Sequence, residues 1–153
     1  MIGDFKFFIL RDLGKVRDEI GKYSDERRIW TTTGEIPNSA GNLCLHLIGN
    51  LNHFIGTQLG NSGYIRERDL EFSDTGIARD GLLASIDSTL AVIERTMSGL
   101  SDQDLQQDFP LEFFDETVTT GWVLMHLATH LNYHLGQINY HRRLLDVSSQ
   151  PNS

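Results

Sequence analysis

The sequence has a single cysteine among its 153 residues. Cys44 therefore has no partner for an internal disulfide, and there is no Cys-x-x-Cys pair to bind zinc or carry out redox chemistry. No apolar run approaches the roughly 20 residues that a membrane-spanning helix needs. The N-terminal stretch "MIGDFKFFIL" is too short for a signal peptide, and Asp4 and Lys6 interrupt it. We therefore expect a cytoplasmic protein.

Positive charge is also scarce. The chain has 13 lysines and arginines against 21 aspartates and glutamates, a formal net charge of -8 with neutral histidines. This balance argues against a nucleic-acid backbone or an anionic membrane surface as the partner. The hydrophobic content of 39% and the length are ordinary for a soluble globular protein. They predict a single domain, residues 1–153, with its own hydrophobic core.

The alternation typical of β-strands does not persist over any useful length, and there is no internal repeat. Apolar residues instead recur at helical spacing in four stretches, separated by turn-rich segments. These predicted helices cover approximately residues 4–30, 39–59, 77–99 and 117–146. Pro37 ends any element before the second helix, Asn38 or Ser39 can cap that helix, and Pro151 follows the fourth. Four helices of this length favour an all-α fold, a four-helix bundle, although the long connections leave other topologies open.

Two long connections separate the predicted helices, residues 60–76 and 100–117, and the second has room for a short extended piece. Loops of this length are uncommon unless they have a role, so residues 60–76 could cover a site or an interface. The acidic residues of this segment are Glu67, Asp69, Glu71 and Asp74. One of them could supply a general base. We favour the alternative, a solvated loop whose carboxylates pair with its own arginines or across a dimer.

The stretch "MHLATHLNYHLGQ" contains three histidines at a spacing of four: His126, His130 and His134. A helix advances about 100° per residue, so the three lie within an arc of about 80°. Gln137 and His141 fall within the same arc. Apolar and aromatic residues flank this arc, which indicates that the histidines point toward the interior.

Side chains at positions i and i+4 of a helix lie one above the other, so two adjacent histidines can reach one metal ion. The outer pair is about 12 Å apart along the helix axis, so a third ligand must come from elsewhere. His46 and His53 lie on the second predicted helix, and His46 can face the fourth from the edge of the core. Two facing helices are a known way to build a metal site.

The alternative is a helical protein whose histidines are hydrogen-bonded core residues without an ion, since a single His-x-x-x-His is a weak motif. Other nucleophiles are less convincing. Cys44 lies about 160° from His46 around its helix and is expected to be a small buried hydrophobe. Ser39 and Ser62 are better explained as cap and turn residues.

Three segments together resemble the DinB-like (YfiT-like) superfamily of metal-dependent enzymes. They are "NSAGNLCLHLIGNLNHFIG", "IRERDLEF" and "HLATHLNYHLGQINYHRRLL", and the resemblance extends from about Trp30 to Leu145. It implies an up-down-down-up four-helix bundle, often dimeric, with three histidines around nickel or zinc. The positions that match this ligand set are His46, His130 and His134.

The resemblance also implies roles for residues near these three histidines. Gln137 matches a Gly-Gln element that lies beside the ligands. His126 matches an extra histidine of one subgroup, which could donate a hydrogen bond or touch a substrate. His53 departs from the pattern and is a reserve ligand should His46 turn outward.

Better-studied members of the superfamily are thiol S-transferases and a thiol-dependent isomerase, and some members are treated as hydrolases. By resemblance we expect a homodimer in which the ion holds a low-molecular-weight thiol as thiolate, for attack on an electrophile. A metal-dependent hydrolase and a non-catalytic, metal-binding dimeric module are the alternatives.

Overall fold

The structure, a computed structural model, describes residues 1–147, so Pro151 and the end of the predicted 1–153 domain lie outside the described residues. It contains the α-helices α1 (Ile2–Gly21), α2 (Ala40–Leu51), α3 (Gln58–Gly60), α4 (Arg68–Ser73), α5 (Arg79–Ser98) and α6 (Thr120–Leu145). Two short 3-10 helices, η1 (Glu26–Trp30) and η3 (Asp104–Gln106), and a π-helix, η2 (Asn52–Thr57), complete the set. Residues 1–147 form no β-strand, only two isolated bridges. The all-α prediction is confirmed.

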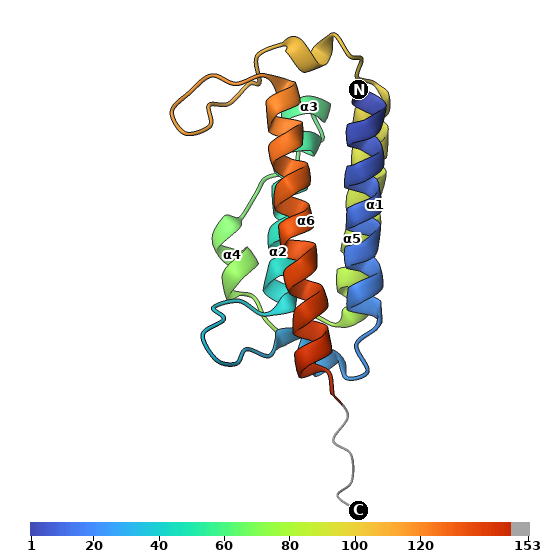
Figure 1. Cartoon of the computed structure of the whole chain (residues 1–153), viewed down its shortest axis with the longest axis vertical. Helices are drawn as coiled ribbons and strands as arrows, with labels where there is room; N and C mark the ends of the chain where they lie inside the picture. The colour runs from blue at the N-terminus through green and yellow to red at the C-terminus, as the bar shows by residue number, and fades with distance from the viewer. Residues whose placement is uncertain (148–153) are drawn as a thin grey trace, which may run out of the picture.

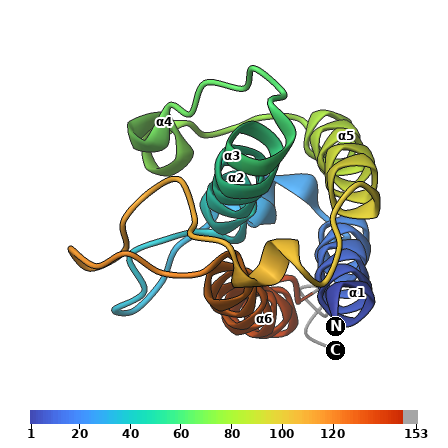
Figure 2. The same ribbon diagram turned by 90° about the horizontal axis from the view of Figure 1, so that it is seen from above.

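The long helices surround one apolar interior. Helix α1 packs against α5 and α6, and α2 packs against the same two helices. Figure 2, viewed from above, shows these four around the shared core. Among the helices of residues 1–147, none is long and apolar enough to cross a membrane. The up-down-down-up order of the resemblance stays a prediction.

Helical spacing of apolar residues explains the core. On α1, Ile9, Leu13, Val16 and Ile20 follow one another at steps of three or four, and all are fully buried. Each buried aliphatic side chain of this size contributes about 1.5–3 kcal/mol. The other helices supply the facing side chains Leu47, Leu51, Ile86, Ile93, Leu124, Leu127 and Leu131. This core holds α2 and α6 side by side.

The predicted element boundaries need two corrections. The helix expected over residues 4–30 ends at Gly21, and the 3-10 helix η1 follows after Asp25, whose side chain caps it by accepting from the Arg27 N–H. The segment 60–76, predicted to be a loop, contains α4, which packs against α2. Six residues are too few to show a helical period. The predicted cap of the second helix is confirmed, because the Ser39 side chain accepts from the Asn42 N–H.

Three connecting segments gather on the side where α2 and α6 meet. They are residues 31–39 before α2, the segment containing α4, and the projecting connection between η3 and α6, and Figures 1 and 2 show them on the same side of the molecule. Loops positioned by a rigid scaffold are where functional residues concentrate. Functional residues are therefore expected on this side of the molecule, where α2 and α6 meet.

Candidate metal centre

The contact between α2 and α6 brings together the three histidines predicted as ligands. His46 comes from α2, and His130 and His134 come from one face of α6. One ring nitrogen of each lies within 4.8 Å of those of the other two. We call this group the histidine cluster. The predicted set and the predicted pair of helices therefore meet in space.

The Nδ1 atoms of the two outer rings of the cluster are engaged by acceptors. His46 Nδ1 lies 3.1 Å from Glu71 Oε1, and His134 Nδ1 lies 2.7 Å from Gln137 Oε1. Carboxylate and amide oxygens accept hydrogen bonds, so each Nδ1 donates the proton. Both rings then turn an unprotonated Nε2 toward the centre of the cluster.

His130 lies between the two outer rings, and no tautomer of its ring gives every nitrogen of the cluster a hydrogen-bond partner. Its Nε2 atom is 3.0 Å from His46 Nε2 and 3.2 Å from His134 Nε2, while its Nδ1 is buried without a hydrogen-bond partner. A neutral imidazole has one N–H, so either tautomer leaves lone pairs facing one another or facing apolar surroundings.

A divalent cation at the point of convergence would bind all three Nε2 lone pairs. Ligand nitrogens about 2.0–2.1 Å from a tetrahedral ion are about 3.3 Å apart, close to the spacing of His130 Nε2 from its two neighbours. Neutral imidazoles suit zinc, nickel, iron and copper alike, so the donor set fits a metal ion without selecting one.

Glu71 is held in place from two sides. Arg66 pairs with it through two parallel contacts of 2.9 Å, Nε to Oε2 and Nη2 to Oε1. Glu71 is buried and Arg66 is mostly so, with 6% and 13% of the two side chains exposed. A Cβ atom on Gly49 of α2 would lie 1.9 Å from Glu71 Oε2, so only glycine leaves room for the carboxylate there. The predicted pairing of a carboxylate with an arginine of segment 60–76 is confirmed for Glu71, but the segment is not wholly solvated: Asp69 is exposed, whereas Glu71 is buried against His46.

The remaining candidate histidines lie outside the cluster. His53 packs edge-on against the Phe54 ring at 4.7 Å. His53 lies seven residues after His46, in the π-helix η2 that continues α2, and therefore about two helical turns beyond it. His126 stacks on the Trp122 ring at 5.4 Å and on the His130 ring at 6.2 Å. It belongs to an aromatic wall beside the cluster.

His141 is a hydrogen-bonded core histidine. Its Nε2 donates to the Thr31 carbonyl oxygen at 2.7 Å, and its Nδ1 accepts from the Tyr23 hydroxyl at 2.6 Å. Both ring nitrogens are satisfied, so the structural explanation holds for this residue. Cys44 is also buried, as predicted, and burial raises the pKa of its thiol to about 12, which excludes it as a nucleophile at neutral pH.

Electrostatics keep the cluster in its metal-binding form. Burial and the neighbouring His134 and His46 lower the pKa of His130 to about 3. Burial also lowers the pKa of His46, against the opposing effect of Glu71. Neutral imidazoles are the form that binds metal ions, and both rings are neutral at physiological pH.

The lowered pKa of His130 predicts a pH dependence of stability in the metal-free protein. The unfolded chain, with a histidine pKa of about 6.5, binds a proton that the folded chain excludes, so stability falls as the pH drops below about 6.5 and continues to fall toward pH 3. Allowing for solvent screening of this partly exposed ring, we expect His130 to cost about 1–2 kcal/mol between pH 6.5 and 4.5.

Urea unfolding of the parent and of a His130→Gln variant at both pH values measures this contribution, since glutamine does not titrate. The parent should lose more stability than the variant. Equal losses would show that His130 is not buried in its neutral form.

The match of a family model places the chain in a DinB/YfiT-like family, the class that the sequence resemblance indicates. The chain belongs to a family described as a protein of unknown function (DUF1572), whose model matches residues 6–149. No curated protein and no protein of solved structure matches the chain.

Proposed function

We propose that His46, His130 and His134 bind one divalent ion, nickel or zinc, and that the protein is a metal-dependent thiol S-transferase. The observation that carries the proposal is the convergence of one ring nitrogen from each of the three histidines. In His46 and His134 the other ring nitrogen, Nδ1, donates its proton to Glu71 and Gln137. The proposal takes α1, α2, α5 and α6 as the four helices of a DinB-like up-down-down-up bundle. It also includes a cytoplasmic homodimer that binds neither nucleic acid nor membranes.

Three neutral ligands would leave a divalent ion with its full charge and an open position, and an ion held there would lower the pKa of a bound thiol. The chain's own residues prepare that position. Glu71 and Gln137 fix the orientation of the outer imidazoles by accepting their Nδ1 protons. The Phe72 ring of α4 lies 5.0 Å from the His46 ring and adds apolar surface beside the cluster.

The contacts of Glu71 favour a thiol over water as the nucleophile. A hydrolase that activates water benefits from a nearby carboxylate that takes up its proton. Both oxygens of Glu71, the carboxylate in contact with the cluster, already accept from Arg66, and one also accepts from His46. A thiol has a much lower pKa than water and depends less on such a base.

The test is conjugation of low-molecular-weight thiols, cysteine and glutathione among them, to 1-chloro-2,4-dinitrobenzene by nickel-loaded, zinc-loaded and metal-stripped protein. We expect turnover that requires the ion, falls at least about 100-fold on stripping and returns on reloading. A His53→Ala variant is the matched control, because it removes a histidine of η2 that lies outside the cluster.

The other outcomes identify the alternatives. Metal-dependent release of nitrophenol from p-nitrophenyl acetate, without thiol conjugation, would indicate a hydrolase. Bound metal with neither reaction would indicate a non-catalytic metal-binding module. Sedimentation of the loaded protein measures the predicted dimer in the same preparations.

A further inference from the structure

A cavity of about 490 Å³ opens beside the histidine cluster, between α6 and the segment that precedes α2. Its α6 wall includes His134, so the cavity reaches one member of the cluster. Tyr140 and Leu144 extend this wall toward the C-terminal end of the helix. The opposite wall is Ile36 and neighbouring residues of segment 31–39, which lies beside the C-terminal half of α6 in Figure 1.

The walls of this cavity are uncharged and largely apolar. Among the described residues that line it, none is an aspartate, glutamate, lysine or arginine. Ile36, Leu43 and Leu144 contribute apolar surface, while Asn38 and Thr33 offer polar contacts. A ligand carboxylate or ammonium group placed here would lose its hydration without gaining an ionic partner. The volume falls in the range of small-molecule sites, about 300–1,000 Å³.

We infer that this cavity binds an uncharged, mainly apolar organic molecule whose reacting end lies at His134. The inference rests on the proposed function and assigns the cavity to the electrophile. Cysteine, glutathione and thiols like them carry carboxylate and ammonium groups, for which these walls provide no counter-charge. The tyrosines on the α6 wall, Tyr133 and Tyr140, give aromatic surface for a planar ligand.

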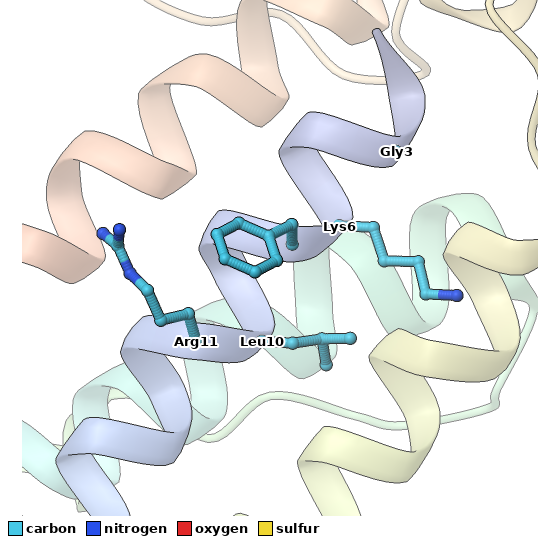
Figure 3. A pocket seen from close by; sticks show the side chains of 5 residues that line it. Gly3, Lys6, Leu10 and Arg11 are labelled. Carbon is cyan, nitrogen blue, oxygen red and sulfur yellow. The ribbon is translucent and has the colours of Figure 1, made fainter.

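A groove on α1 serves as the contrast. It is lined by Gly3, Lys6, Phe7, Leu10 and Arg11. Figure 3 shows Lys6 and Arg11 extending in opposite directions from this helix. The groove therefore combines apolar surface with two cations, and it contains no member of the histidine cluster. Phe7 is 60% exposed and Leu144 is 69% exposed, so we expect the fold to tolerate a substitution equally well at either position.

The first experiment uses the metal-free full chain and the neutral fluorophore N-phenyl-1-naphthylamine. We expect saturable binding that weakens at least about tenfold in Leu144→Glu and changes less than about twofold in Phe7→Glu. An Ile36→Glu variant places the same charge on the opposite wall and should weaken binding in the same way. Circular dichroism confirms that each variant is folded.

Three results would overturn the inference: no binding to the parent, equal loss in the α1 variant, or unchanged affinity in both cavity variants. A Leu144→Glu variant that changes the sedimentation coefficient while keeping its probe affinity would assign the surface to a second copy of the chain instead.

The second experiment locates the ligand relative to the ion. A neutral trifluoromethyl-naphthalene is followed by fluorine NMR in protein loaded with cobalt or with zinc. Paramagnetic cobalt should broaden the resonance of the bound ligand, and zinc should not. Cobalt that is bound but causes no broadening would overturn the inference. Probe binding by protein that takes up neither cobalt nor zinc would count against the metal proposal and still support the cavity as an apolar site.

Discussion

A His130→Ala, His134→Ala double variant is expected to retain no divalent ion under conditions in which the parent retains about one per chain. The substitutions remove two of three converging ligands, and His46 alone cannot hold the ion against water. Metal content after loading with nickel or zinc and exhaustive dialysis measures the difference. The parent should also gain thermal stability on loading, by about 2.7 kcal/mol at 100 times the dissociation constant, and the double variant should gain none.

Two further variants separate the cluster from the other histidines. His53→Ala removes a histidine of η2, about two turns beyond His46, and His126→Ala removes a ring stacked on His130 but outside the cluster. Both should keep close to one ion per chain. A parent that stays empty after soaking in nickel and zinc would show that the three histidines are core residues without a metal role.

Helix geometry predicted that two adjacent histidines of the series 126, 130 and 134 could share an ion, and the family resemblance selected His130 and His134 together with His46. The spacing of four places His130 and His134 on one face of a helix, and that face was recognisable from its apolar flanks. Helical angle alone could not choose between His46 and His53; the resemblance chose His46, and the structure brings His46 together with His130 and His134. The separation of His46 and His53 along the helix axis explains the difference, because His46 is at the level of the α6 pair.

The support around the cluster could not be predicted in the same way. Glu71 lies in a helix of six residues, too short for a periodic signal, and it meets His46 across 25 positions of sequence. Arg66 and Glu71 are only one possible pairing among the many charges of this segment. Gly49 carries no signal of its own in a helix, and only the position of the Glu71 carboxylate explains why a glycine is needed there.

The cavity is another consequence of tertiary packing. The sequence "TTTGEIPNS" predicts a break between helices but not the surface that the break covers. Its position against α6 follows in part from contacts that no local pattern reveals, such as the hydrogen bond from His141 to the Thr31 carbonyl. His141 therefore holds the start of segment 31–39, which forms the cavity wall opposite α6, and takes no part in the histidine cluster.

Replacing Glu71 with glutamine is expected to weaken divalent-metal binding by about 10- to 100-fold, the usual effect of losing the group that orients a ligating histidine. Glutamine keeps the shape of the side chain but not its charge, so it holds the His46 Nδ1 proton less firmly and leaves Arg66 without an ionic partner. Isothermal titration with zinc at neutral pH measures the change. Gly49→Ala should act in the same direction, because its Cβ atom would displace the carboxylate without altering the charge.

Asp69→Asn is the matched control for this prediction, because Asp69 lies on the same helix α4 and is exposed. We expect its zinc affinity to stay within about twofold of the parent. If Glu71→Gln instead binds zinc as tightly as the parent but unfolds at lower urea concentration, Glu71 serves to hold α4 on α2. The orientation of His46 would then come from the packing of its ring against Phe72 and His130, which the substitution leaves in place.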